Sequence, residues 1–347
     1  MGAHSSNQSK EHIIISNDTE RYLTSVWLAW FVPSVHTLVV ALSLPLNLMA
    51  IFMFVVKMKL KKPAIVYMLN LASADVLFVS TLPFKISYHF SGHNWIFGPE
   101  MCRFVTAAFY CNMYCSILLM TAISIDRFLA VVYPMQALSW RTVRRASVAC
   151  CVIWLVAIAG VIPLLIMEQT QRIPQLSITT CQDVLDLSVV LEILRYYFSA
   201  STILFFFIPL IISVSCYVCI IRNLSSSKTI AEKPGKKRRA ILLSAAVLCS
   251  FIFCFGPTNV LALMQNLLLS PDQRFEGLTF AYILAVSVGT LSCCTDPLLY
   301  YYASSECQRK VRNLFCQKKN SELEKSNQTT SSNMATFSNS LNNLSQA

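Results

Sequence analysis

The sequence alternates between long apolar runs and shorter polar connections. An α-helix of about 20 apolar residues crosses a hydrocarbon core of about 30 Å, and each run is long enough to do so. The pattern therefore predicts an all-α membrane protein, a bundle of seven transmembrane helices. We place the seven spans roughly at 27–56, 63–90, 99–133, 144–166, 196–222, 238–268 and 276–302.

The third run ends in an adjacent acid and base, Asp126 and Arg127. As a helix, the stretch from Cys102 to Arg127 is about 38 Å long, so the cysteine and the charged pair reach opposite water interfaces. Because a charge at membrane depth is costly, Arg127 beside Asp126 indicates a functional position. The alternative is an interfacial anchor, in which Arg127 extends to the lipid surface with a local counter-ion.

Composition supports the membrane class. Of the 347 residues, 55% are hydrophobic, and the mean hydropathy is +0.55, which a soluble domain could not bury. Several runs contain proline, which a packed bundle tolerates because neighbouring helices can bond the freed backbone groups. These prolines are Pro45, Pro83, Pro163, Pro209, Pro257 and Pro297.

The basic residues set the orientation. Most of the 28 lysines and arginines lie in alternate connections, which marks that side as cytoplasmic and the amino terminus as extracellular. We expect a multi-pass protein of the plasma membrane. Its net charge of +11 then faces anionic membrane lipid and a cytoplasmic partner, and no nucleic-acid partner is expected.

The two ends carry modification signals. Residues 1–26 form an extracellular segment without an apolar signal-peptide core, so we expect the first span to direct insertion. Asn7 and Asn17 lie in glycosylation acceptors on the outer side. A basic amphipathic stretch after the seventh span predicts a short helix on the inner leaflet, with Cys316 open to palmitoylation. The tail 317–347 is predicted to be disordered and phosphorylatable, open to receptor kinases and arrestin.

The cysteines predict one disulfide. Most of the 14 lie within the spans, where cysteine acts as a small apolar residue. Cys102, at the outer end of the third span, and Cys181, in the long outer loop 167–195, lie in the oxidising compartment. A bond between them would tether this loop over the mouth of the bundle.

Polar residues inside the spans predict a buried ion centre. Asp75 and Asp296 cannot both stay ionised and unpaired at mid-membrane, so either one is protonated or a cation bridges them. With Ser116 as a third oxygen ligand, the set fits an allosteric sodium ion, and no other cofactor is expected. The alternative is a purely structural hydrogen-bond network.

Two prolines mark candidate hinges. Pro257 follows the aromatic residues Phe251 and Phe255 in the sixth span, and it opens the helical hydrogen-bond ladder. Pro297 follows Asp296 in the seventh span, so the second hinge is expected beside the buried acid. Rings at such positions are more often core than switch, but two hinges around a charged centre suit a bundle with two packings.

Together these residues resemble the rhodopsin-like family of G-protein-coupled receptors over about 27–316. The resemblance implies an outer ligand pocket and an inner cavity for a heterotrimeric G protein, contacted by Arg127. It implies switch roles for Asp126, Phe251, Phe255, Pro257, Pro297 and Tyr300. The matching positions are Asn47, Leu71-Ala72-Ser73-Ala74-Asp75, Asp126-Arg127-Phe128, Trp154, Pro209, Phe251, Cys254, Pro257, Asp296, Pro297 and Tyr300.

The sequence further resembles the proteinase-activated receptors, of the thrombin-receptor type that acts in blood coagulation. In that subfamily a serine protease cuts the amino-terminal segment, and the new terminus acts as a tethered peptide agonist. The positions that match its pocket are Tyr110, Asp183, Leu185, Leu261 and Tyr282. The resemblance rests on YLTS (22–25), FVPSV (31–35), KISYHFSG (85–92), CRFVTAAFYCNMY (102–114), CQDVL (181–185), FGPTNVL (255–261) and YYYASSECQR (300–309).

The chain also departs from the subfamily. Residues 1–26 contain no recognisable cleavage and tether sequence, and residues 262–266 replace larger aliphatic and aromatic side chains. At the inner end of the sixth span, Lys237 stands where many family members carry an acid that holds the third-helix arginine. We therefore expect Asp126 and packing to hold the resting state.

Other functions are weighed on specific residues. Acids of the outer loops favour a basic group on a peptide ligand, whereas Phe109, where amine receptors carry an acid, argues against an amine. A lipid or nucleotide receptor of the same branch is the main alternative, and a transporter is a remote one. An enzyme is not expected, since His36 has no catalytic partners in the sequence and is expected to be an interfacial or hydrogen-bonded core residue.

Overall fold

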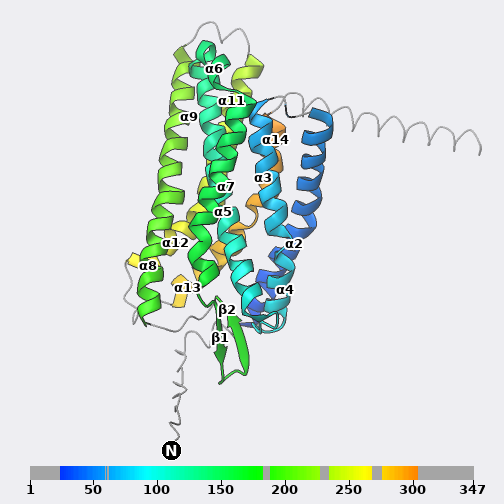
Figure 1. The fold of residues 1–347 in the computed structure, drawn as a ribbon, viewed down its shortest axis with the longest axis vertical. Helices are drawn as coiled ribbons and strands as arrows, with labels where there is room; N and C mark the ends of the chain where they lie inside the picture. The colour runs from blue at the N-terminus through cyan, green and yellow to red at the C-terminus, as the bar shows by residue number, and fades with distance from the viewer. Residues whose placement is uncertain are drawn as a thin grey trace, which may run out of the picture. The chain divides into compact units, whose positions relative to one another are not determined.

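The computed structural model describes residues 24–58, 60, 62–182, 188–226, 234–267 and 276–303. They form an almost entirely helical chain with one small hairpin (Figure 1). Its helices are α2 (Val26–Phe52), α3 (Pro63–Val79), α4 (Leu82–Phe90), α5 (Gly98–Val132), α6 (Pro134–Trp140), α7 (Val143–Ile166), α8 (Ser188–Thr202), α9 (Ile208–Ser226), α11 (Pro234–Cys249), α12 (Gly256–Leu267), α13 (Glu276–Gly289) and α14 (Ser292–Ala303).

Within these residues, seven helical segments are long and apolar enough to cross a membrane, as the sequence predicts. Several of them join two of the helices named above through a turn or a π-helical segment. The spans are Val26–Met58, Pro63–Phe90, Gly98–Val132, Val143–Ile166, Arg195–Leu224, Ile241–Gln265 and Phe280–Pro297.

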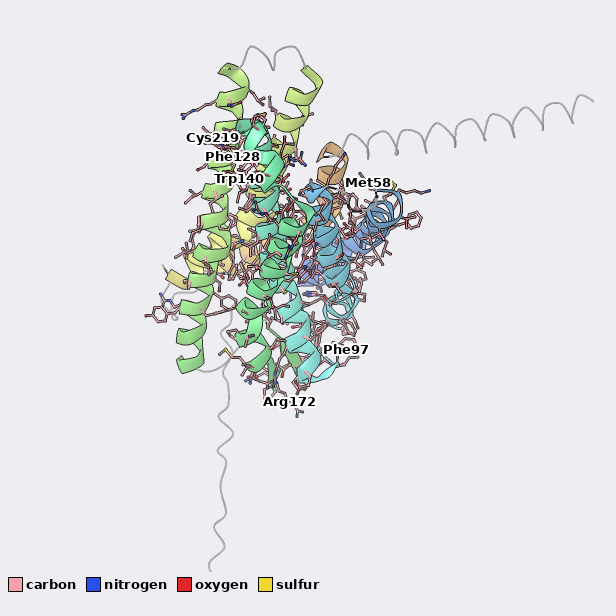
Figure 2. The ribbon with its side chains drawn as sticks, turned by 45° about the horizontal axis from the view of Figure 1, so that its top comes forward. Met58, Phe97, Phe128, Trp140, Arg172 and Cys219 are labelled. Atoms are coloured by element: carbon pink, nitrogen blue, oxygen red, sulfur yellow. A yellow bond between two sulfur atoms is a disulfide. The ribbon has the colours of Figure 1, made fainter. Side chains whose placement is uncertain are left out.

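The chain divides into two units, residues 1–299 and residues 300–347. The first unit contains the spans and is organised around α5, which packs against α3, α7 and α9. In this unit the β1–β2 hairpin lies beyond one end of the long helices and α6 lies at the other (Figure 1). Side chains follow the same division, with Phe97 and Arg172 near the hairpin end and Phe128 and Trp140 at the opposite end (Figure 2). We call the hairpin end the outer end.

Prolines explain most of the interruptions in the helices. The second span breaks between α3 and α4, where Pro83 in the first turn of α4 cannot donate a backbone hydrogen bond. The π-helical segments Ile203–Phe207 and Ser250–Phe255 come directly before the turns that hold Pro209 and Pro257. A widened turn of this kind is a common place for a helix to change direction.

The seventh span departs from the prediction of a hinge at Pro297. It breaks at residues 290–291, between α13 and α14, and Pro297 lies inside regular helix. The carbonyl of Cys293, which Pro297 cannot bond, instead accepts hydrogen bonds from Asn47 Nδ2 at 2.9 Å and Ser43 Oγ at 3.1 Å. Two donors from α2 thus replace the missing backbone bond, which explains why the helix continues through the proline.

The hairpin pairs strands β1 (Thr170–Ile173) and β2 (Ile178–Cys181) antiparallel, with Thr170 opposite Cys181. The turn between them contains Ser177 at a φ of +54°. Beyond β2, Gln182 is also left-handed, with a φ of +74°, and its backbone N–H bonds the carbonyl of Gln169 at 2.8 Å. This register brings the end of β2 back beside the outer end of α5.

Candidate functional site

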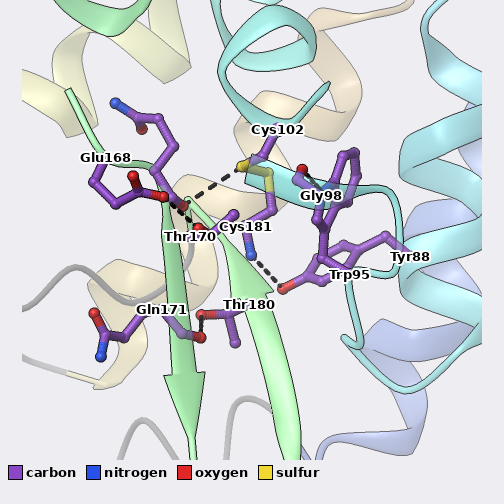
Figure 3. Close-up of a disulfide and its surroundings, with 10 residues drawn as sticks. Tyr88, Trp95, Gly98, Cys102, Glu168, Thr170, Gln171, Thr180 and Cys181 are labelled. Atoms are coloured by element: carbon purple, nitrogen blue, oxygen red, sulfur yellow. Dashed lines mark hydrogen bonds between the residues drawn. A yellow bond between two sulfur atoms is a disulfide. The ribbon is translucent and has the colours of Figure 1, made fainter. Parts of the chain in front are cut away.

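The predicted disulfide joins the hairpin to α5. Cys102 and Cys181 are bonded, with their Cα atoms 5.8 Å apart, and both are fully buried. Tyr88 and Trp95 pack around the bond, and the Tyr88 hydroxyl accepts a hydrogen bond from the Cys181 N–H at 3.5 Å (Figure 3). The bond holds β2 across the outer end of the bundle, so the prediction of a tethered loop is confirmed.

A polar cluster fixes the other strand. Arg103 on α5 donates to Glu168 Oε2 at 2.7 Å, and the Thr170 hydroxyl donates to Glu168 Oε1. These two donors, Thr170 first, hold the pKa of Glu168 below its ordinary value, because both favour the charged carboxylate. Arg103 also approaches Glu100 at 3.3 Å, one helical turn away.

Beneath the hairpin, two of the predicted pocket residues meet. The hydroxyls of Tyr110 on α5 and Tyr282 on α13 lie 3.3 Å apart, and Gln182 Nε2 donates to the Tyr110 hydroxyl at 3.2 Å. The ring of Phe198 on α8 lies 5.3 Å from that of Tyr110. The structure thus brings together the aromatic rings of Tyr110, Tyr282 and Phe198 with two hydroxyl groups. Gln182, the residue after Cys181, covers them on the outer side.

Gln182 and Phe198 were not among the predicted pocket residues. Gln182 lies within the CQDVL motif and could have been found there, whereas no sequence signal indicated Phe198. Leu261 is half-buried on α12. Asp183 and Leu185 lie outside the described residues.

A small cavity of about 20 Å³ lies deeper between the helices, room for about one water molecule. Its lining includes the predicted switch residue Phe255, together with Asn112 and Thr258. The Asn112 Oδ1 and Thr258 Oγ1 atoms are buried and have no hydrogen-bond partner in the described part of the chain. The cavity also touches Phe78, Gly289 and Ser292, so it reaches four different spans.

The predicted ion centre is fully buried. Asp75 and Asp296 are 0% exposed and Ser116 is 1% exposed. All four carboxylate oxygens and the Ser116 hydroxyl lack a hydrogen-bond partner among the described residues, and the two carboxyl groups lie within interaction range of each other. Such oxygens suit a hard cation such as sodium. The described residues contain no cluster of three or more His, Cys, Asp or Glu arranged for a metal ion.

At the inner end, Asp126 bonds mainly to a residue that the sequence did not indicate. Arg141, at the end of α6, donates from Nε and Nη2 to the two Asp126 oxygens, both at 2.7 Å. Arg127 is more distant, with its Nη2 at 3.7 Å from Asp126. These hydrogen bonds also raise the pKa of Arg141. We expected Asp126 to help hold the resting state, and the structure gives it a specific partner, Arg141, on the segment after the third span.

Other motif residues make contacts between neighbouring spans. Trp154 on α7 donates its indole N–H to Asn70 Oδ1 on α3 at 3.0 Å, which fixes two spans together. Phe251 and Phe255 are buried, with the Phe251 ring 6.3 Å from that of Phe206. Tyr300 lies on α14 in the second unit.

The expectation for His36 is not met. It is buried, and neither ring nitrogen has a hydrogen-bond partner within the described part of the chain. Its ring instead lies 6.2 Å from that of His89. The sequence could not reveal this contact, because the two residues come from different spans.

The remaining predictions concern residues outside the described part of the chain. These are the glycosylation acceptors Asn7 and Asn17, the palmitoylation candidate Cys316, the amphipathic helix after the seventh span, and the tail 317–347. Lys237 lies on the described helix α11, but its side chain is not described.

Comparison with known proteins identifies the class. Residues 46–300 match the family described as 7 transmembrane receptor (rhodopsin family). Since the match covers most of the chain and agrees with the seven spans, the chain belongs to this family of G-protein-coupled receptors. It is a multi-pass receptor of the plasma membrane that signals through G proteins, and it is not an enzyme.

The individual relatives define the branch as that of the proteinase-activated receptors. Proteinase-activated receptor 1 of Homo sapiens is 62% identical over 332 residues, which cover 95% of this chain and 78% of that protein. The receptor of the same name from Xenopus laevis is 60% identical over 308 residues, 89% of this chain and 72% of its own. Proteinase-activated receptor 2 of Rattus norvegicus is 39% identical over 298 residues, 85% of this chain and 74% of its own.

Proposed function

We propose that this receptor responds to a peptide agonist, released or exposed by a serine protease, that binds at the Tyr110–Tyr282 pair. The relatives are named as proteinase-activated, which supports protease control of this chain. The observation that carries the proposal is the group of hydrogen-bonding side chains formed by Gln182 and the two tyrosine hydroxyls under the disulfide-bonded hairpin. A lipid or nucleotide agonist is not favoured.

The pocket suits a peptide for a chemical reason. Hydroxyl and amide groups can exchange their mutual hydrogen bonds for bonds to a peptide backbone, while the rings of Tyr110 and Phe198 offer apolar contact. Ligand binding there would shift α13 relative to α5, because the two tyrosine hydroxyls join those helices. Phe255 and the small cavity lie deeper between the same spans, so a movement of α13 would change the packing around them.

The finer partners follow from the same proposal. Sodium at Asp75, Ser116 and Asp296 would stabilise one packing of the bundle and so tune agonist affinity. Receptor kinases and arrestin would act on the tail 317–347, and palmitoylation of Cys316 would attach the chain after the seventh span to membrane lipid. Asn7 and Asn17 would carry the glycans.

The test is a panel of thrombin, trypsin and free peptides of the tethered type, applied to cells that express the full chain. The readout is GTP-analogue loading of a co-expressed G protein. We expect a peptide response that Tyr110→Phe weakens about tenfold, the loss of one or two hydrogen bonds in a buried site. Tyr196→Phe is the matched control, because Tyr196 is 71% exposed. Equal peptide potency in Tyr110→Phe and wild type, or a response to no member of the panel, would overturn the proposal.

A further inference from the structure

Three histidines from three separate segments gather at the outer end of the bundle. His36 lies on α2, His89 in the last turn of α4, and His93 in the turn that follows α4. All three are buried, with exposed fractions of 5%, 7% and 0%. We call them the histidine cluster. Nothing in the pocket, the ion centre or the inner end uses them.

The rings contact one another directly. His89 Nδ1 and His93 Nε2 lie 3.2 Å apart, and the two rings meet edge to face with centroids separated by 5.0 Å. A hydrogen bond at this distance needs one nitrogen to carry the proton and the other to accept it, so the pair as drawn holds a single proton between the two nitrogens. The His36 ring lies against His89, and both of its nitrogens lack hydrogen-bond partners among the described residues.

The titratable groups that act on two members of the cluster, His36 and His89, are all bases. The titratable groups that act on His89 are His93, His36 and Lys85, and each is a base. The Lys85 ammonium lies 5.9 Å from the centre of the Tyr88 ring, and that ring contacts both His89 and His93. No carboxylate acts on His36 or His89 in the described part of the chain. A proton added to His36 or His89 in the packed cluster would therefore introduce a buried charge beside other bases.

The histidine cluster also adjoins the segment that is hydrogen-bonded to the hairpin. His93 takes a left-handed φ of +61°, and its N–H bonds the Tyr88 carbonyl at 3.1 Å. The next two residues bond to the hairpin, since Asn94 Oδ1 accepts from the Thr179 N–H at 3.1 Å and the Trp95 N–H donates to the Thr179 carbonyl at 2.7 Å. Tyr88 and Trp95 then lie directly beside the disulfide (Figure 3).

We propose that the histidine cluster is a proton-binding site that, only while it is neutral, holds residues 91–97, the outer loop between α4 and α5, against the hairpin. As the pH falls below about 6.5, protons bind the form in which the rings of His36, His89 and His93 are separated, so the balance shifts toward this open form, in which the turn at His93 is displaced and the bonds from Asn94 and Trp95 to Thr179 are broken. The hairpin, which lies above the tyrosine pair, then loses its hydrogen bonds to residues 94 and 95. The direction of the pH dependence follows from the neutral state of the packed histidines. The contact with the hairpin is fully formed above about pH 6.5, where an exposed histidine titrates, and it is lost as the pH falls.

The first test is the thermal stability of the purified full chain in detergent between pH 7.5 and pH 5.5. We expect the wild-type Tm to fall with pH, and the fall to be reduced in His89→Gln and in His93→Asn, an exchange that tolerates the left-handed φ. The chain has five histidines, so the double variant His4→Gln/His12→Gln is the matched control and should fall like wild type. A pH dependence that is the same in wild type and in both cluster variants overturns the proposal.

The second test needs no variant. Hydrogen exchange of the wild-type receptor is followed in residues 91–97 and 170–181, after correction for the intrinsic effect of pH on exchange. If one proton controls the contact, the opening equilibrium rises by about tenfold for each pH unit below the titration. We expect this rise in both segments and none in residues 143–166 of α7. Unchanged corrected protection at pH 5.5 in both segments overturns the proposal even where the variants fail to fold.

Discussion

Arg141 holds Asp126 through two parallel hydrogen bonds of 2.7 Å, whereas Arg127, its neighbour in sequence, lies 3.7 Å away. The paired geometry is the strong form of an arginine–carboxylate contact. It ties the inner end of α5 to the loop after the third span. Because the sixth span carries Lys237 rather than an acid at its inner end, this contact offers a different restraint on the resting state.

Loss of this contact is expected to raise ligand-free signalling. Arg141→Ala and Asp126→Ala each break the ion pair between the partly exposed Arg141 and the buried Asp126, worth about 1 kcal/mol, which corresponds to about a fivefold shift between resting and active states. GTP-analogue loading at equal surface expression measures it. Arg144→Ala, an exposed arginine on α7, should leave basal signalling unchanged. Basal output at the wild-type level in both Arg141→Ala and Asp126→Ala would count against this role.

Sodium is expected to alter agonist affinity through the buried acids. Asp75→Asn removes one carboxylate from the centre, so the affinity of an activating peptide should no longer vary across a sodium series. Ser73→Ala serves as control, because the Ser73 hydroxyl on the same helix donates to the Leu69 carbonyl at 2.8 Å, a bond within its own helix. If sodium shifts affinity equally in wild type and Asp75→Asn, the centre is a structural network instead.

The disulfide is expected to supply a large share of the stability of the outer end. It closes a loop with a sequence separation of 79 residues, and loss of such a bond costs about 2–5 kcal/mol. The double variant Cys102→Ser/Cys181→Ser should therefore show a clearly lower Tm in detergent and insensitivity to reductant. Cys151→Ser, at an exposed free cysteine, should match wild type. A double variant as stable as wild type would contradict the expectation.

A side chain at Gly160 is expected to crowd the ring of Phe205. A Cβ atom there would lie 3.0 Å from the ring of Phe205, and the Gly160 carbonyl accepts a hydrogen bond from the Tyr197 hydroxyl. Gly160→Ala should cost about 1–3 kcal/mol through overpacking between the fourth and fifth spans. Gly277→Ala is the matched control, since its Cβ would meet nothing within 4 Å. Equal Tm values for the two variants would show that Phe205 moves freely.

Acid should weaken the hairpin at a second place, through Glu168. Its pKa is lowered in the folded state, so its contribution is present above the ordinary value of 4.5 and is lost as pH falls through the folded value. Below pH 4.5, Glu168→Gln should flatten the decline in hairpin protection measured by hydrogen exchange. Glu100→Gln, whose side chain is 81% exposed, is the control. The same decline in Glu168→Gln as in wild type would remove this role.

The sequence by itself determined the number of spans, the disulfide and the family. Apolar length is a property of consecutive residues, so each of the seven spans could be read from its own segment. Cys102 and Cys181 could be paired because the orientation left them as the cysteines facing an oxidising compartment, and the structure confirms the bond. The resemblance to receptors rested on short motifs within single helices, and the comparisons confirm it.

Only the tertiary structure decided which side chains face each other across helices. Pro297 was expected to bend its helix, but Asn47 and Ser43 on α2 supply the missing bonds and keep it regular. In the same way, Arg141 at Asp126 and His36 at His89 depend on how neighbouring helices are rotated and how far they are shifted along their axes. An apolar run does not encode that rotation, because lipid and protein interior are both apolar, and packing and polar bonds between helices set it instead.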